Sequence, residues 1–226
     1  MSSAEIFPPQ APTVREAAAA ERRAAILRAA KEVFLEAGYE LASMDRIAER
    51  AGTTKRTVYD RFGSKEALFG AMVEHACANF VAQLPGPDNL PADPRQGLRE
   101  AATRGVALIT SSGCVRLTRI VAGEAERRPQ FAAALRAAFD GGQARLEAYL
   151  IACVAAGTLK PHDTALTARL FSDAISHAAS HRALFGEPAD TAAATAVADA
   201  IVRVILTRYA LRGLAEMGVR NDLVET

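Results

Sequence analysis

Apolar residues recur along most of the chain at steps of three and four, which is the spacing of one face of an α-helix. The sequence lacks the alternating Val, Ile, Thr and Tyr runs that are typical of strands. Its alanine-rich, glycine-poor runs favour helix. The pattern predicts an all-α protein, with a short helix after Ser43 and further helices over 16–37, 55–62, 64–84, 94–111, 113–127, 129–156, 162–185 and 189–216.

One stretch near the amino end predicts two short helices separated by a tight turn. Ser43 is a suitable cap for the first helix, because its hydroxyl can accept a free N–H of the opening turn. Gly52 is expected to end that helix, as glycine often does just past a helix end. Thr53 and Thr54 are suitable caps for the second helix, which ends before Gly63. This order of elements is that of a helix-turn-helix.

The second short helix lies in a basic segment. Five cations face a single anion between positions 50 and 65, a local net charge of +4 in a chain whose formal net charge is +1: Arg50, Lys55, Arg56, Arg61 and Lys65 against Asp60. Cations interspersed with hydroxyls and a tyrosine suit the binding of phosphates and base edges. The simpler alternative is a solvated charged face on an ordinary helix. The helix-turn-helix pattern beneath these charges favours DNA binding.

The same residues carry a family resemblance. The segment that begins at Gly38, GYELASMDRIAERAGTTKRTVYDRFGSKEALF, closely resembles the DNA-binding segment of TetR-family transcriptional regulators, and the likeness extends back to about Glu21. The family most often has a small residue where this chain has Arg56, so its base preference does not carry over. A weaker likeness links RLTRIVAGEAERRPQFAAALRAAF, which begins at Arg116, to the C-terminal domain of AefR-like repressors.

The resemblance implies a regulator that binds palindromic double-stranded DNA, most simply a repressor released by a small molecule. From chemistry and resemblance together, we expect Lys55, Arg56 and Thr57 to face bases. We expect phosphates to be held by a second group: Ser43, Thr53, Thr54, Tyr59 and Lys65. Two other classes stay open, a ligand-binding or scaffold protein that binds no operator and an all-helical enzyme.

The last predicted helix is apolar around most of its circumference, so more than one of its faces must be covered. A two-fold homodimer through the last two helices would cover the second face, and TetR-family proteins usually dimerise in this way. A central helix buried in a monomer is the alternative. The expected dimer residues are Ala174, Ala178, Val197, Ile201, Val202, Ile205 and Tyr209.

The resemblance also implies a small-molecule pocket in the C-terminal domain, beside the helix at 64–84. An apolar wall would indicate a hydrophobic ligand, although most of the candidates are more simply explained as core. The candidates are Phe80, Leu108, Leu117, Val121, Phe131, Phe139, Leu170, Phe171 and Ile175.

Other signs of chemistry are weak. Asp173, His177 and His181 share a helical stripe, but they span nearly two turns, too far for all three to bind one metal ion. The three cysteines form no C-x-x-C pair, and they are most simply buried apolar residues. Cys114 is the best candidate for a redox-sensing thiol. With no phosphate-binding glycine loop and no nucleophile elbow, we expect no enzyme, no metal and no cofactor.

The domain prediction divides the 226 residues into four segments. Prolines and small polar residues predict a disordered arm over 1–15. A helix-turn-helix domain over 16–63 and a connecting helix over 64–84 follow, and a ligand-binding and dimerisation domain covers 85–226. Because the start lacks a basic segment followed by an apolar one, and no long charge-free apolar run follows, the expected location is the cytoplasm.

Overall fold

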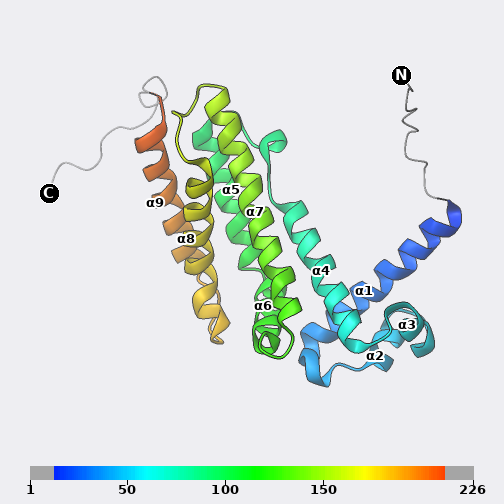
Figure 1. Ribbon diagram of the computed structural model, residues 1–226. Coiled ribbons are helices and arrows are strands. Elements are labelled where there is room, and N and C mark those ends of the chain that lie inside the picture. Colours follow the sequence, from blue (N-terminus) through cyan, green and yellow to red (C-terminus); the bar gives the residue numbers. More distant parts are fainter. Residues whose placement is uncertain (1–12, 212–226) are drawn as a thin grey trace, which may run out of the picture. The chain divides into compact units, whose positions relative to one another are not determined.

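The computed structural model describes residues 13–211, and every regular element in that range is helical (Figure 1). The predicted all-α fold is confirmed. The elements are α1 (Val14–Leu41), α2 (Met44–Arg50), α3 (Lys55–Phe62), α4 (Lys65–Gln83), the 3₁₀ turn η1 (Pro87–Asn89), α5 (Pro94–Ile109), α6 (Ser112–Glu124), α7 (Pro129–Ala155), α8 (Thr164–Leu184) and α9 (Thr191–Tyr209).

The two predicted chain ends differ from the structure where it describes them. Helix α1 begins at Val14, because Thr13 and Glu16 cap each other in a capping box. Part of the predicted arm is therefore helical, and its residues 1–12 lie outside the described range. Helix α9 ends at Tyr209 rather than near position 216, and positions 212–216 also lie outside that range.

The described chain divides into two compact units, with the boundary between Met72 and Val73. The first unit contains α1, α2, α3 and the beginning of α4. Its core includes three aromatic rings, since Phe69 packs edge-on against Phe34 at 4.8 Å and against Tyr39 at 5.0 Å between ring centroids. Gly38 has φ +76°, which ends the regular part of α1 and turns Tyr39 back onto these rings.

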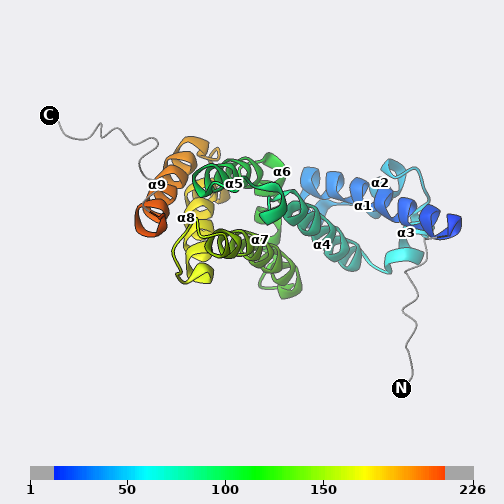
Figure 2. The same ribbon diagram turned by 90° about the horizontal axis from the view of Figure 1, so that it is seen from above.

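The second unit is a helical bundle in which α8 packs against both α7 and α9, and α5 packs against α8 and α9 (Figure 2). The buried core between these helices includes Leu98 of α5, Leu150 of α7, Phe171 of α8 and Val202 of α9.

Polar bonds fix the connections within this second unit. The Tyr149 hydroxyl on α7 donates to the carbonyl of Pro91 at 2.8 Å, and Arg145 Nε donates to the carbonyl of Leu84 at 2.9 Å. Arg119 on α6 donates to the carbonyl of Ala183 at the end of α8. These bonds attach the segment between α4 and α5 to α7, and α6 to α8.

Within residues 13–211, no single helix has the length and apolar composition of a membrane span. Helices α5 and α6 together would have both, but they are bent by 61° relative to each other.

Candidate nucleic-acid interface

Helices α2 and α3 form the predicted pair of short capped helices. Ser43 Oγ accepts from the backbone N–H of Asp45 at 3.2 Å and caps α2. Thr54 Oγ1 accepts from the backbone N–H of Thr57 at 3.1 Å and caps α3. Gly52 in the turn has φ +63°, a conformation that other residues adopt only with strain. The local sequence therefore sets both ends of the turn.

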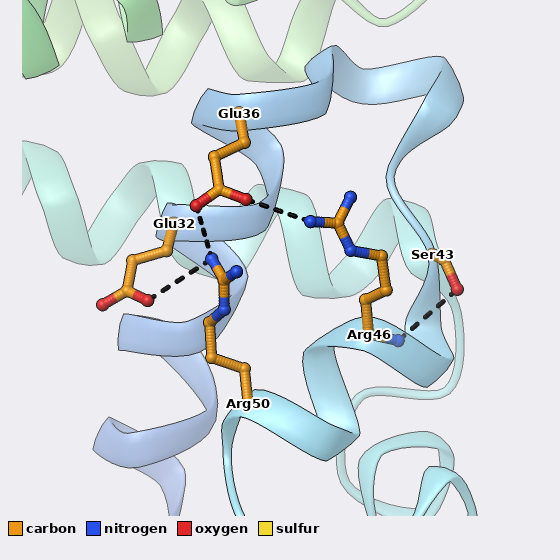
Figure 3. A network of polar contacts seen from close by, with 5 residues as sticks. All are labelled: Glu32, Glu36, Ser43, Arg46 and Arg50. Carbon is orange, nitrogen blue, oxygen red and sulfur yellow. Dashed lines mark hydrogen bonds and ion pairs between the residues drawn. The ribbon is translucent and has the colours of Figure 1, made fainter.

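Four charged side chains fasten α2 to α1, and we call them the carboxylate–arginine network: Glu32, Glu36, Arg46 and Arg50. Glu36 accepts from Arg50 Nη1 at 2.7 Å through one oxygen and from Arg46 Nη2 at 3.1 Å through the other (Figure 3). Glu32 Oε2 lies 3.5 Å from the same Arg50 nitrogen. The hydrogen bond from Arg50 lowers the pKa of Glu36, and Glu36 raises the pKa of Arg50. The network fixes the position of α2.

Ion pairs inside and outside this network reduce the positive charge that the sequence predicts for the interface. Arg50 is matched by Glu32 and Glu36 on α1. Lys55 Nζ lies 2.8 Å from Asp45 Oδ2 on α2, which raises the pKa of Lys55. The count of +4 therefore overstates the positive charge that faces solvent, because its acidic partners lie outside positions 50–65.

Helix α3 contacts the core through Val58 and Phe62, both buried. Its other faces are solvent-exposed. The Arg56 side chain is 90% exposed and only loosely paired with Asp60, at 3.7 Å. Tyr59 is 41% exposed. The amino end of α3 also carries Thr53, Thr54, Lys55 and Thr57, which are exposed or half-buried.

Lys65 differs from the other predicted DNA contacts. Its ammonium group donates to the carbonyl of Glu40 at 2.8 Å and lies 4.9 Å from the centre of the Tyr39 ring. Arg61 on α3 likewise donates to a carbonyl, that of Ala19 on α1. Both cations hold the first unit together while keeping their charge, since a carbonyl does not neutralise it.

The second unit contains a mostly apolar cavity of about 80 Å³ that is partly open to solvent. Helices α4, α5, α7 and α8 contribute to its wall. Four of the predicted pocket residues line it: Phe80, Phe139, Phe171 and Ile175. Sequence reasoning missed the polar part of the wall, Gln143, Ser172 and Ser176. The four-residue step from Phe139 to Gln143 places both on one face of α7 and was an available signal.

The other five predicted pocket residues do not line this cavity. Leu117, Val121 and Phe131 are buried in the packing around α6 and α7, and Leu108 is half-buried on α5. Leu170 is 54% exposed, because it lies on the side of α8 opposite Phe171 and Ile175.

The predicted dimer residues divide into two groups. Val202 and Ile205 are 2% and 3% exposed and belong to the core of the subunit. The others are half-buried: Ala174, Ala178, Val197, Ile201 and Tyr209. Tyr209 stacks on His162 at 4.0 Å between ring centroids. Helix α8 also exposes Leu166 and Leu170, and α9 exposes Val204, none of which the sequence analysis placed on this surface.

The candidate metal ligands do not form a cluster. The rings of His177 and His181 lie 4.7 Å apart, whereas Asp173 is engaged with Gln143 and Arg169. Among the described residues, no group of three His, Cys, Asp or Glu side chains has an arrangement that could hold a metal ion. Cys77 is buried and Cys114 is half-buried, and neither forms a disulfide.

Comparison with known proteins agrees with both units. The model for the AefR-like transcriptional repressor C-terminal domain matches residues 96–211, more than half of the chain, and the model for bacterial regulatory proteins of the tetR family matches residues 26–72. The chain belongs to the TetR family. The expectation drawn from the motifs after Gly38 is thereby confirmed.

Curated relatives resemble part of the chain. The transcriptional activator FasR of Mycolicibacterium smegmatis is 42% identical over 81 residues, which cover 36% of this chain and 37% of FasR. The transcriptional repressor NicS of Pseudomonas putida is 40% identical over 88 residues, which cover 38% of this chain and 41% of NicS. The matches thus span less than half of the length of either relative.

Solved structures resemble nearly the whole described chain. A TetR-family regulator from Mesorhizobium loti has a TM-score of 0.75 at 25% identity, over 85% of this chain and 98% of its own. The flavonoid-responsive regulator FrrA has a TM-score of 0.66 at 27% identity, over 85% of this chain and 99% of its own.

Proposed function

We propose that this TetR-family protein is a sequence-specific, DNA-binding transcriptional regulator that binds a palindromic operator as a homodimer. The observation that carries the proposal is the capped α2–turn–α3 motif, which exposes the amino end of α3. An α-helix fits the major groove of B-DNA, where each base pair presents a distinct pattern of donors and acceptors. In this proposal residues 16–63 bind DNA, 64–84 connect, and 85–226 bind the ligand and the second subunit.

The contacts divide by their chemistry. Arg56 is the prime candidate for base reading, since its guanidinium is exposed and can donate two hydrogen bonds to one guanine. Lys55 and Thr57, its neighbours in the chain at the amino end of α3, are proposed as further base contacts. Lys65 and Tyr59, with the capping hydroxyls of Ser43, Thr53 and Thr54, are proposed to bind phosphates. Because phosphates carry no sequence information, these residues set affinity rather than preference.

The DNA test is a mobility-shift titration with the DNA upstream of the protein's own gene. Arg56→Ala should lose about 1–3 kcal/mol of discrimination at specific base pairs. Lys65→Ala should weaken all sequences about equally and reduce the slope of log affinity against log salt by about 0.9. Arg104→Ala on α5 removes the same charge in the second unit and is the matched control. Equal effects of Arg56→Ala and Arg104→Ala would contradict the assignment.

The proposed dimer surface is the outer side of α8 and α9. Leu166 and Leu170 are four residues apart on α8 and more than half exposed, so they form an apolar stripe that a second subunit would cover. Ala174 and Ala178 continue this side with small residues that permit close approach. Sedimentation velocity measures the oligomeric state, and a solitary protomer at micromolar concentration would rule out the dimer.

We further propose that a small molecule in the apolar cavity controls DNA binding. The cavity includes Phe80 of α4, a helix that begins in the first unit and ends in the second. A ligand that fits only one arrangement of these helices shifts the population toward it, by no more than its preference between the two states. The AefR-like model is named for a repressor, which favours release of a repressor by its ligand. FasR, in contrast, is named an activator. A reporter assay with and without ligand distinguishes repression from activation.

Two alternatives give different results in the same experiments. A ligand-binding or scaffold protein would bind no operator at any salt concentration. An enzyme would turn over a compound that binds the cavity, whose described lining contains no acidic, basic or thiol side chain.

A further inference from the structure

The wall of the apolar cavity contains aromatic rings and no ionisable side chain among the described residues. Phe80 and Phe139 pack edge-to-face, with ring centroids 6.4 Å apart and planes at 67°, and Phe171 joins them from α8. Rings gain from edge-to-face and offset contacts with other rings, in addition to the burial of apolar area. An aromatic ligand therefore matches this wall better than an alkyl chain does.

The polar side of the cavity offers a defined hydrogen-bond acceptor. Gln143 Nε2 donates to Asp173 Oδ1 at 3.3 Å. Because an ionised carboxylate only accepts, this bond turns the amide nitrogen toward Asp173 and leaves the Gln143 carbonyl oxygen for another donor. Within the described range, that oxygen and the hydroxyls of Ser172 and Ser176 accept no hydrogen bond from the protein. A ligand hydroxyl would satisfy the acceptor on Gln143.

The charged groups near the cavity balance one another. A neighbouring hollow shares Phe139, Gln143, Ser172 and Ser176 with the cavity and adds two arginines and two aspartates. One pair is formed, with Arg169 Nε 3.5 Å from Asp173 Oδ2. This surface has no net charge to attract an anionic headgroup, and a charge inside the cavity would lose its hydration without a partner.

We propose that the cavity binds an uncharged aromatic molecule that carries a hydroxyl group and donates it to Gln143. The proposal rests on ligand control as proposed above, and it names the chemical class of the ligand. The phenyl rings supply most of the affinity, and the amide of Gln143 supplies the selectivity for a hydrogen-bond donor.

The test compares four probes by calorimetry on the full chain without DNA: 2-naphthol, its methyl ether, 2-naphthoate and decanoate. The methyl ether keeps the rings but lacks the donor, the naphthoate adds a charge, and decanoate replaces the rings with a chain. We expect 2-naphthol to bind about tenfold more tightly than its ether and more tightly still than either anion. Tighter binding of either anion, equal binding of the ether, or no binding of 2-naphthol at about 1 mM would overturn the proposal.

Two variants test the location. Gln143→Leu should remove the preference for 2-naphthol over its ether. Gly105 on α5 lines the cavity, and a Cβ placed there meets nothing within 4 Å, so Gly105→Leu should fill the cavity and weaken 2-naphthol at least about tenfold. Gly123→Leu on α6 is the matched control, because Gly123 also has open space but lies outside the cavity wall. Unchanged binding by Gly105→Leu would overturn the proposal.

Operator affinity measured with and without 2-naphthol distinguishes a failure of the proposed ligand class from a failure of ligand control. Allosteric coupling is reciprocal, so a ligand that alters operator affinity must bind the operator complex with altered affinity by the same factor. Binding of 2-naphthol with unchanged operator affinity would support the cavity chemistry and contradict ligand control. Operator binding without any 2-naphthol binding would support DNA recognition and refute the proposed ligand class.

Discussion

Gly97 on α5 lies against the buried phenol of Tyr149, and replacing this glycine with alanine should destabilise the second unit. An ideal Cβ at Gly97 would lie 1.9 Å from the Tyr149 hydroxyl oxygen and 2.9 Å from the Pro91 carbonyl oxygen. Tyr149 is 2% exposed, and its hydroxyl donates to that carbonyl. Burial also raises the pKa of Tyr149 well above its usual range. The methyl group of alanine would displace the hydroxyl from its partner.

The magnitude follows from three terms. A buried hydroxyl that loses its partner costs about 1–3 kcal/mol. Forcing a methyl group into a packed site costs about 1–3 kcal/mol. Alanine is the better helix former by about 1 kcal/mol. The free energy of unfolding should therefore fall by about 1–5 kcal/mol.

Gly105→Ala on the same helix is the matched control, because a Cβ at Gly105 meets nothing within 4 Å. Only the helix-propensity term applies there, and the variant should gain about 1 kcal/mol. Urea unfolding followed by circular dichroism measures both variants. Relative to wild type, the midpoint of unfolding should move to higher urea in Gly105→Ala and to lower urea in Gly97→Ala. A Gly97→Ala variant as stable as Gly105→Ala would refute the reasoning.

Three further predictions concern charge, thiols and assembly. Because the hydrogen bond from Arg50 lowers the pKa of Glu36 in the folded protein, wild type should be more stable than Glu36→Gln above the ordinary pKa of glutamate. That advantage should be lost as the pH falls through the lowered pKa, and a gap independent of pH in a denaturation series would contradict it. Burial raises the pKa of the Cys77 thiol to about 11, whereas Cys114 is half-buried. An aromatic disulfide reagent at about pH 8 should therefore modify Cys114 first. Cys114→Ser should remove the fast phase of this modification. Leu170→Glu should shift the sedimentation profile toward monomer while leaving the helical circular dichroism unchanged, because this side chain is 54% exposed within the subunit.

Local signals in the sequence were sufficient for the DNA-binding motif. The predicted range of the second short helix agrees with α3, because its cap, Thr54, and its terminating glycine, Gly63, act within one turn of the helix ends. The charge of that motif was not predictable in the same way. The partners of Arg50 are Glu32 and Glu36, which lie 14 or more positions away, so only the folded chain brings them together.

The cavity shows a different limit. Phe131 and Phe139 lie eight positions apart on α7 and have the same chemistry, but Phe131 is buried in core and Phe139 lines the cavity. Helical periodicity identifies an inward face and does not distinguish a filled space from an empty one. The vacant space depends on small residues such as Gly105, whose missing side chain leaves the neighbouring helix without a contact.

The carboxylate–arginine network has a consequence for how any operator titration is interpreted. Its four side chains are 34% to 60% exposed, so added electrolyte screens their mutual attraction. The same electrolyte competes with the protein for DNA. Raising ionic strength would thus loosen the attachment of α2 while it weakens phosphate contacts. The number of phosphates inferred from a salt series would be inflated unless the thermal stability of the unbound protein is followed across the same range.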